Sequence, residues 1–286
     1  MQGLAAGISN IYQNNRYLSD VFALFDLKPV IESSAFINTP NQKEPTGFSV
    51  DNLYFKYPHA TDNILENVNL NIPAGQIIGL VGLNGAGKST LIKLLCRLYD
   101  PDQGVIRAGT KDIREFNINE YRSKVSVVFQ DFVKYNLTAN ENIWFGNIHS
   151  PMDEKEIKTA AEDSGAASYI SNFPDQYNTI LGRIFDDGHE ISGGEWQKLA
   201  IARVLYSKSQ LIILDEGASA LDIFAERELF INLKQRLGNR SALVISHRLS
   251  TIQQADLIYV MQNKTIIEQG SHDALLQKNG VYAKLY

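Results

Sequence analysis

The chain has 286 residues, 44% of them hydrophobic and 21% charged, and this composition excludes a disordered protein. The formal net charge of -5 argues against a nucleic-acid-binding protein, because binding to phosphates along a nucleic acid requires a basic face. Cys96 is the only cysteine, which excludes a disulfide framework and a thiolate metal cluster and fits a small core residue in a reducing compartment.

The sequence has no pattern that predicts a membrane span or a secretory signal. No run approaches 18 consecutive apolar residues, and the N-terminus lacks a basic region followed by an apolar run. We therefore expect any membrane part to lie elsewhere and this domain to face the cytosol.

The first 46 residues are predicted to lie outside the main domain. Apolar residues recur near helical spacing over residues 1 to about 28, which predicts an amphipathic helix that ends before Pro29. Residues 33–47 are mainly Ser, Asn, Thr, Pro and Gln, a composition typical of a linker. We place a domain boundary there, with a helix and linker over 1–46 and one domain over 47–286.

Short strand-like runs begin after Gly47 and predict an α/β fold. The inner runs are almost continuously apolar and are separated by helical stretches, as in a parallel sheet that is covered on both faces. From about residue 131 to 206 the strand signal vanishes and segments such as 155–167 are helical, which predicts an inserted helical subdomain. The predicted strands span residues 48–55, 76–81, 124–129, 211–214 and 243–245.

A glycine-rich segment lies between the predicted strand 76–81 and the helical run 91–98, and it fits the pattern G-x-x-x-x-G-K-[ST]. Its glycines let backbone N–H groups converge on phosphate oxygens at the start of a helix, Lys88 adds a positive charge, and the Ser89 hydroxyl can bind Mg²⁺. A plain glycine turn before a helix is the alternative, which the match of pattern and context disfavours. The predicted phosphate-binding residues, which we call the phosphate loop, are Gly82, Leu83, Asn84, Gly85, Ala86, Gly87, Lys88, Ser89 and Thr90.

Two carboxylates end the apolar strand at 211–214, where a parallel strand opens toward a ligand crevice. Asp215 is expected to hold Mg²⁺ through a water molecule, and Glu216 to take a proton from an attacking water. The alternative is an acidic pair that caps the next helix. Beside a phosphate site we favour the catalytic interpretation.

Two further polar residues end predicted strands. His247 follows the apolar strand 243–245, and this position favours a contact with a terminal phosphate over a structural role. Gln130 ends the strand 124–129, where its amide could reach Mg²⁺ or the attacking water, although its position alone leaves this open.

The segment Ile191-Ser192-Gly193-Gly194-Glu195-Trp196-Gln197 opens an apolar helix that continues through Leu205. This segment can form a second anion site, because it combines a hydroxyl, two glycines and a helix N-terminus. The alternative is an ordinary helix cap, which would have the same residues. The segment resembles the ABC signature, usually written LSGGQ, and it lies between the phosphate loop and Asp215 as it does in the ABC ATPase family.

The resemblance to the ABC ATPase family covers about residues 47–286 and implies further roles. It implies a P-loop NTPase core with a mostly parallel sheet, an antiparallel β edge region and the inserted helical subdomain. Tyr57 resembles the aromatic residue that stacks on adenine, and Gln130 the Q-loop glutamine. Asp222 lies in a segment similar to the D-loop, and His247 resembles the switch histidine.

In this family two such domains pair head to tail, and each ATP lies between the phosphate loop of one and the signature of the other. The resemblance therefore implies ATP and Mg²⁺ as cofactors and a second nucleotide-binding domain as partner, in a homodimer or a pair of half-transporters. In that arrangement residues Ser192, Gly193, Gly194 and Glu195 would contact the ATP of the partner.

The sequence departs from the family pattern at several positions. Glu195 replaces the usual Gln, Ile191 replaces Leu, and Gly217 stands where Pro or Ala is usual, but none of these changes removes a catalytic group. Residues 181–188 match the exporter X-loop poorly, with Asp186 as a possible substitute for its acid.

The leading hypothesis is the ATPase of an exporter, at the cytoplasmic face of the cell membrane, whose longer chain begins with membrane helices. The helix at 1–28 is similar to the end of the last of these helices, so a transmembrane domain is the second expected partner, and no nucleic acid is expected. The SGGEWQK form favours a peptide cargo. A soluble ABC ATPase unrelated to transport is the alternative, and a catalytically inactive regulatory module conflicts with the intact catalytic residues.

Overall fold

A computed structural model of the chain describes residues 2–31, 47–184, 188–217 and 223–285. The chain forms two compact units, Met1–Glu32 and Ser33–Tyr286, which we describe separately. The first unit contains helix α1 (Gln2–Phe25), which confirms the helix predicted for this segment. Large apolar side chains of α1 such as Tyr17, Phe22 and Phe25 are exposed. No helix in the described ranges is both long and apolar enough to cross a membrane.

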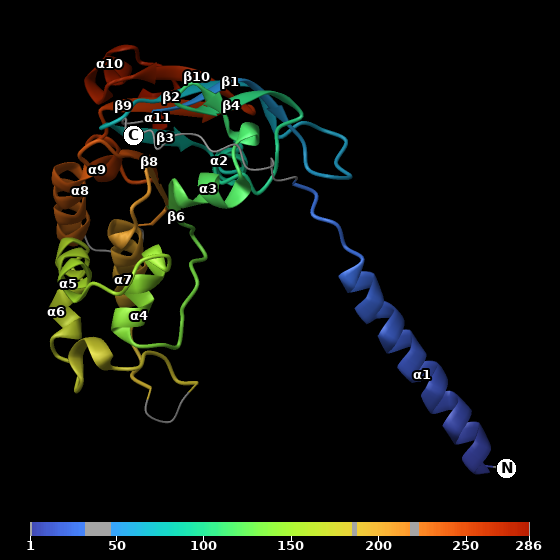
Figure 1. The fold of residues 1–286 in the computed structure, drawn as a ribbon. Coiled ribbons are helices and arrows are strands. Elements are labelled where there is room, and N and C mark those ends of the chain that lie inside the picture. The colour runs from blue at the N-terminus through green and yellow to red at the C-terminus, as the bar shows by residue number, and fades with distance from the viewer. Residues whose placement is uncertain (1, 32–46, 185–187, 218–222, 286) are drawn as a thin grey trace. The chain divides into compact units, whose positions relative to one another are not determined.

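A six-stranded sheet is the centre of the second unit (Figure 1). Its strand order is β10-β9-β3-β8-β7-β6, and every neighbouring pair is parallel except β9 and β10. Strands β3, β7 and β8 are buried along their whole length, which explains their continuous apolar sequences and confirms the predicted strands. The strands are β3 (Ile77–Gly82), β6 (Val125–Val128), β7 (Leu211–Asp215), β8 (Ser241–Ile245), β9 (Leu257–Gln262) and β10 (Thr265–Gly270).

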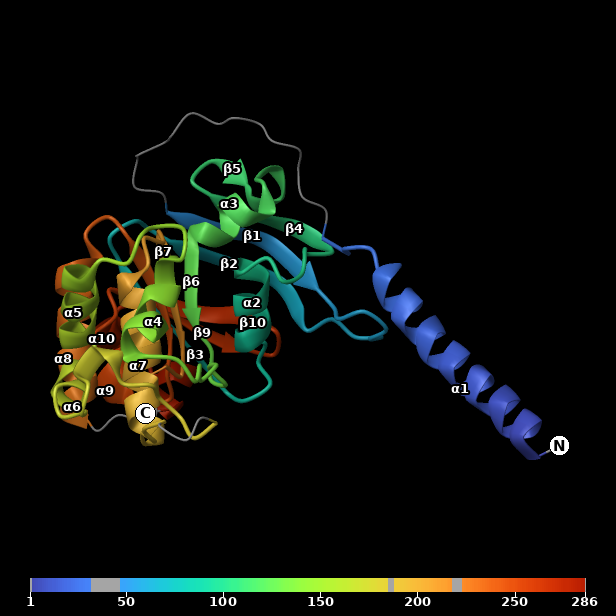
Figure 2. The same ribbon diagram turned by 60° about the horizontal axis from the view of Figure 1, so that its bottom comes forward.

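A four-stranded antiparallel sheet in the order β2-β1-β4-β5 packs beside the first (Figure 2). Only β1 (Phe48–Phe55) among its strands was predicted, since β2 (Leu65–Ile72) and β4 (Gln103–Ala108) lack a long continuous apolar run and β5 (Lys111–Asp112) has two residues. Apolar side chains of β1, β2 and β4 form one core cluster with those of β3 and helix α2 (Lys88–Leu95). The main core therefore lies between the two sheets and around the helix that follows the phosphate loop.

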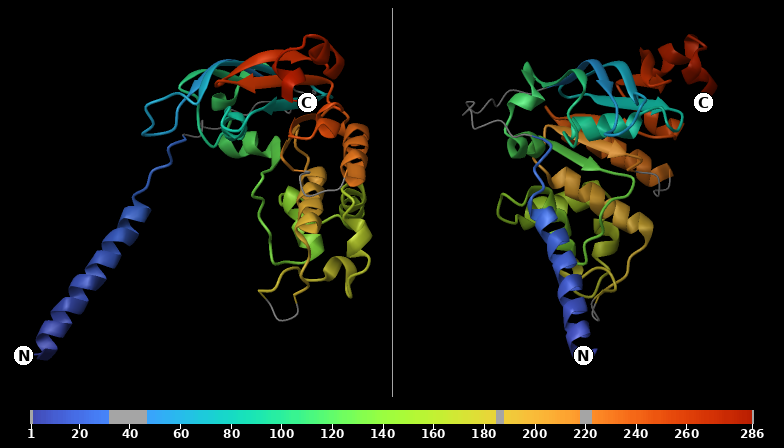
Figure 3. Two further views of the ribbon diagram at one scale, coloured as in Figure 1. Left: turned by 180° about the vertical axis from the view of Figure 1, so that it is seen from behind. Right: turned by 90° about the vertical axis from the view of Figure 1, so that its right-hand side faces the viewer.

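Residues between β6 and β7 form helices, with only isolated β-bridges among those described (Figure 3). Helix α4 begins with a capping box in which the Thr138 hydroxyl accepts from the Glu141 N–H and the Glu141 carboxylate accepts from the Thr138 N–H. Buried side chains of these helices make their own apolar cluster. The helices are α4 (Ala139–Trp144), α5 (Glu154–Asp163), α6 (Ala167–Ile170) and α7 (Gly193–Tyr206).

The remaining helices cover the six-stranded sheet. Side chains of α7 and α8 pack on β7, β8 and the end of β6, and those of α9, α10 and α11 pack on β3 and β9. Short helix α3 precedes β6. These helices are α3 (Ile118–Ser123), α8 (Ile223–Leu237), α9 (Leu249–Ile252), α10 (His272–Gln277) and α11 (Val281–Leu285).

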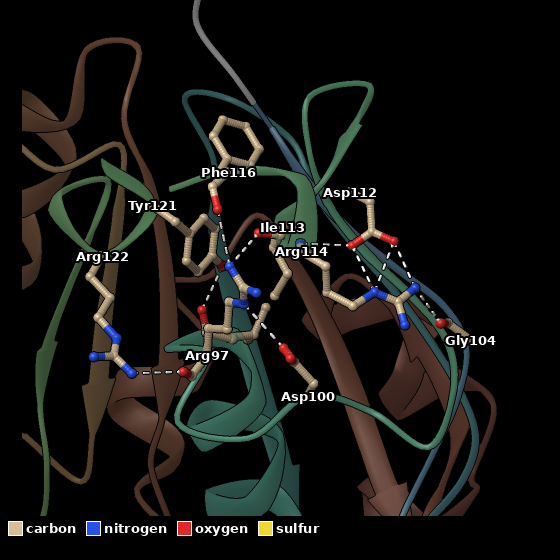
Figure 4. Close-up of polar contacts among 10 residues, drawn as sticks. Arg97, Asp100, Gly104, Asp112, Ile113, Arg114, Phe116, Tyr121 and Arg122 are labelled. Carbon is tan, nitrogen blue, oxygen red and sulfur yellow. Dashed lines mark hydrogen bonds and ion pairs between the residues drawn. The ribbon is translucent and has the colours of Figure 1, made fainter. Parts of the chain in front are cut away.

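Arg97 anchors the C-terminal end of α2 (Figure 4). The side chain is 2% exposed; its Nε donates to Asp100 at 3.1 Å, and its Nη1 donates to the carbonyls of Ile113 and Phe116 at 3.0 and 3.2 Å. The Arg97 carbonyl in turn accepts a hydrogen bond from Arg122 at 3.0 Å. A charged group is thus buried with its hydrogen bonds made, and it joins α2 to the segment before α3.

Cys96, the cap residue at the end of α2, is 8% exposed and packs in the main core. Burial raises the pKa of its thiol to about 12. The thiol therefore stays protonated and unreactive at neutral pH, in agreement with a residue that fills the core.

We expect Arg97→Ala to lower the free energy of unfolding by about 3–5 kcal/mol, because it leaves Asp100 and two buried carbonyls without their partner. The matched control is Lys208→Ala, which removes the pair with Glu156 between side chains that are 63% and 47% exposed. That exposed pair should contribute less than about 1 kcal/mol. Urea unfolding of both variants tests the expectation, and equal losses would contradict it.

Candidate functional site

The carboxyl ends of the central parallel strands meet at one edge of the six-stranded sheet. The pairing of β3 with β8, and of β8 with β7, places the phosphate loop, Asp215 and the residues after Ile245 at this edge. Glu216 continues this pairing, because its N–H donates to the Ile245 carbonyl at 3.0 Å. Polar residues from segments far apart in the sequence are therefore neighbours.

The phosphate loop requires its glycines for close packing as well as for backbone conformation. Gly87 precedes α2 with a φ of 106°, and a Cβ there would lie 2.6 Å from Leu65. A Cβ at Gly82 would lie 2.1 Å from the Met261 carbonyl oxygen. Larger residues at either position would displace the loop.

The Lys88 side chain folds back over the phosphate loop. Its Nζ donates to the carbonyl oxygens of Gly82 at 2.7 Å and Leu83 at 3.1 Å, and the residue is 8% exposed. Burial lowers the pKa of the Lys88 ammonium, while the nearby carboxylates of Glu216 and Asp215 act in the opposite direction. The loop thus holds a positive charge close to two acids, Glu216 and Asp215, which would also face a bound phosphate.

Asp215 and Ser89 are brought together across the edge. Asp215 is 6% exposed, and its carboxylate accepts a hydrogen bond from the Ser89 hydroxyl. Burial raises the pKa of the Asp215 carboxyl, and the Ser89 hydrogen bond and the positive charge of Lys88 partly oppose this effect. A hydroxyl and a carboxylate in contact are the oxygen ligands that suit Mg²⁺, so the residues present fit that ion.

Glu216 lies beside His247. The His247 Nε2 and the Glu216 Oε1 are 3.1 Å apart, and the two side chains are 49% and 25% exposed. The backbone φ of Glu216 is 51°, in the left-handed region that a residue with a side chain rarely adopts. Both side chains are open to solvent, as groups that act on a bound molecule must be.

Tyr57 packs against helix α2, which follows the phosphate loop. Its hydroxyl lies 3.1 Å from the Thr90 hydroxyl and accepts a hydrogen bond from Lys93 at 3.4 Å. Its ring makes edge contacts with Phe55 and Tyr99, with centroid distances of 5.2 and 5.3 Å. Tyr57 therefore stands in a fixed position beside α2, partly exposed.

The signature segment caps helix α7. Ser192 and Glu195 form a capping box, in which the Ser192 N–H donates to the Glu195 carboxylate at 2.7 Å and the Glu195 N–H donates to the Ser192 hydroxyl at 3.3 Å. The space beside Gly193 is open. Among the residues that the structure describes, no hydrogen bond or ion pair joins 192–195 to the phosphate loop of the same chain.

Gln130 follows strand β6, which is parallel to β7 and ends at the same edge of the sheet. It is exposed, two residues beyond the end of β6. Asp222, like Asp186 of the poorly matched X-loop, lies outside the described residues.

Sequence reasoning missed several polar residues near the edge. The Gln197 Nε2 donates to the Glu216 carbonyl at 3.2 Å. Glu226, 1% exposed, accepts hydrogen bonds from the Thr251 hydroxyl and, at 3.1 Å, from Arg248. The sequence signal for Gln197 and Glu226 is a polar residue on the apolar face of a predicted helix, and this signal does not reveal what the residue contacts.

Comparison with protein families identifies this arrangement. The family model described as ABC transporter matches residues 65–219, from the start of β2 to beyond Glu216. The chain belongs to the ABC transporter family. The predicted α/β fold with a P-loop core, an antiparallel edge and inserted helices is confirmed as the ABC ATPase fold, which implies nucleotide binding.

Relatives within the ABC family are longer proteins. The chain is 37% identical over 266 residues to ATP-binding cassette sub-family B member 5 of Homo sapiens, a match that covers 93% of this chain and 21% of the human protein. It is 33% identical over 285 residues to the nisin transport ATP-binding protein NisT of Lactococcus lactis subsp. lactis, which covers 100% of this chain and 48% of the relative.

A solved structure of a bacterial Atm1-family ABC exporter with ATP bound matches with a TM-score of 0.84 at 32% identity. The match covers 96% of this chain and 47% of that chain. The chain therefore spans about a fifth to a half of the length of these ABC relatives.

Asp215 gives a prediction of pH-dependent stability. Because burial raises the pKa of its carboxyl, the folded domain favours the protonated form, and this stabilisation is lost as the pH rises through the folded pKa. We therefore expect Asp215→Asn to raise the Tm at neutral pH, with a gain that shrinks as the pH falls below the pKa of the unfolded chain. Thermal unfolding over a pH series measures this, with the exposed Asp62→Asn as control. A Tm for Asp215→Asn at neutral pH equal to or below the wild type would contradict the expectation.

Proposed function

We propose that this chain is the ATP-binding and ATP-hydrolysing domain of an ABC exporter. The observation that supports it most is the single group formed by Lys88, the Ser89–Asp215 contact and the Glu216–His247 contact at the carboxyl edge of a parallel sheet. Each member has the chemistry that phosphate binding or water activation requires.

ATP binding is assigned to the phosphate loop and Tyr57. Backbone N–H groups of residues 82–90 and the N-terminus of α2 would bind the phosphates, and the Lys88 ammonium would exchange its two carbonyl contacts for phosphate oxygens. The Tyr57 ring, fixed by its contacts with Phe55, Tyr99 and Thr90, would stack on adenine.

Ser89 and Asp215 would hold a magnesium ion, Asp215 through a water molecule, and Gln130 would complete the ligands. When bound, Mg²⁺ would offset the negative charge that develops on the phosphate in the transition state. The buried Asp215 carboxylate would gain a positive partner there, which would offset the cost of burying its charge.

Hydrolysis is assigned to Glu216 as general base. Its partly exposed carboxylate would take the proton of the attacking water, while His247, 3.1 Å away, would orient that carboxylate and contact the terminal phosphate. Lys88 would stabilise the developing negative charge on the phosphate oxygens.

A second nucleotide-binding domain would complete the site. Ser192, Gly193, Gly194 and Glu195 form a separate helix N-terminus with open space beside it, which suits a phosphate held by another chain. We propose a head-to-tail pair, either of identical chains or of two half-transporters, in which Asp222 lies near the contact. ATP would favour the closed pair and hydrolysis would release it.

A transmembrane domain is the other proposed partner, with this domain at the cytoplasmic face of the cell membrane. One relative has nisin transport in its name and the similar solved structure is an ABC exporter, which supports export and favours a peptide as cargo. A soluble ABC ATPase without a role in transport is the alternative, which these relatives disfavour.

The test is Glu216→Gln, which removes the base and leaves the phosphate loop and signature intact. We expect phosphate release to fall roughly 100-fold to 10,000-fold, while ATP binding persists and ATP shifts the variant to a dimer. Phosphate release and size-exclusion chromatography with and without Mg-ATP are the measurements.

The matched control is Glu228→Gln, an exposed position on α8, which should behave as wild type. Unchanged turnover in Glu216→Gln, together with a monomer in both conditions, would show that Glu216 is not the base.

A further inference from the structure

Two hydrogen bonds hold the backbone of Glu216 in its left-handed conformation. Its N–H donates to the Ile245 carbonyl at 3.0 Å, which continues the pairing of β7 with β8. Its carbonyl accepts from the Gln197 side chain at 3.2 Å, and this second bond comes from helix α7 rather than from the sheet. The direction in which the Glu216 side chain leaves the strand thus depends on both elements.

Gln197 is a buried amide on an apolar part of α7. It is 3% exposed, and its neighbours along the helix, such as Trp196, Ala200 and Ile201, belong to apolar clusters. A buried amide destabilises a fold unless it is hydrogen-bonded. The hydrogen bond to the Glu216 carbonyl therefore explains why a polar residue is tolerated at this buried position.

Helix α7 is itself firmly attached to the helical region. The Tyr169 hydroxyl donates to the Glu195 carbonyl at 2.8 Å, and Arg203 Nε donates to the Asn142 carbonyl at 2.9 Å. The capping box at Ser192 fixes the start of the same helix. A displacement of the signature segment would thus reach Gln197 through one rigid helix.

We propose that Gln197 is a positioning residue for ATP hydrolysis. Through the Glu216 carbonyl it keeps the base in the left-handed backbone conformation beside His247, and it links the base to the helix that carries the signature segment. The proposal rests on the proposed function, because it requires that Glu216 be the general base.

The first test is Gln197→Met, which keeps the volume of the side chain and removes the donor. We expect kcat to fall roughly 3-fold to 10-fold, as for the loss of one hydrogen bond, with an unchanged KM for ATP. In a Glu216→Gln background the same change should lower the single-turnover rate less than about 2-fold, because the two residues act together. An equal loss in both backgrounds, or a lower Tm with unchanged kcat, would overturn the proposal.

The matched control is Gln210→Met. The Gln210 Oε1 is buried and has no hydrogen-bond partner among the described residues, so its loss should leave kcat and KM unchanged. A similar fall in kcat for Gln210→Met would show that any amide-to-thioether change in this core slows the enzyme, and would overturn the proposal.

The pH dependence of the hydrolysis rate of Gln197→Glu distinguishes a positioning role of Gln197 from a packing role. A protonated carboxyl can donate to the Glu216 carbonyl and an ionised one cannot, and burial favours the protonated form. The rate of Gln197→Glu relative to Gln197→Met should therefore rise as the pH falls from about 9 to about 6. A flat ratio would overturn the proposal, whereas a wild-type rate in Glu216→Gln would overturn the proposed function instead.

Discussion

The candidate site depends on one constraint, the parallel pairing of β3, β8 and β7 in a sheet whose central strands are fully buried. Parallel strands place all their carboxyl ends at one edge, so the phosphate loop, the two carboxylates and His247 meet there although they are far apart in the sequence. The apolar packing that forms the sheet also positions the polar residues. A change in the register of β7 against β8 would move Asp215 and Glu216 together, and with them the proposed metal ligand and base.

The residues at this edge also lower the free energy of unfolding. Lys88 and Asp215 are each less than a tenth exposed, and burial shifts the pKa of each toward its neutral form. Glu216 adds a left-handed backbone. Hydrogen bonds offset these effects in part. Lys88 donates to two carbonyls, and Ser89 donates to Asp215. The backbone of Glu216 is bonded to the Gln197 side chain and to the Ile245 carbonyl. A bound Mg-nucleotide would supply the remaining partners, so ligand binding and stability should increase together.

Much of the fold could be predicted because its strands are buried on both faces and have continuous apolar sequences. Strand β9 has such a run and could also have been predicted, whereas β2 is interrupted by exposed polar residues and β10 has no fully buried residue, so both give a weak signal. The positions of the phosphate loop, Asp215, Glu216 and His247 could be predicted because each lies at or just beyond the carboxyl end of a strand. Gln197 and Glu226 could not, since their roles depend on which buried helix face lies against Glu216 and Arg248. The domain boundaries and the roles assigned to all the site residues, Gln130 and Asp222 included, stay predictions.

In the proposed mechanism two chains build each site for ATP hydrolysis, one with Lys88 and Glu216 and the other with Ser192. The most direct test is phosphate release per chain, measured at saturating Mg-ATP over roughly two decades of chain concentration, with sedimentation of the same samples. If two chains build each site, the rate per chain rises with concentration in parallel with the dimer fraction. A constant rate per chain, at concentrations where the chain sediments as a monomer, would contradict it.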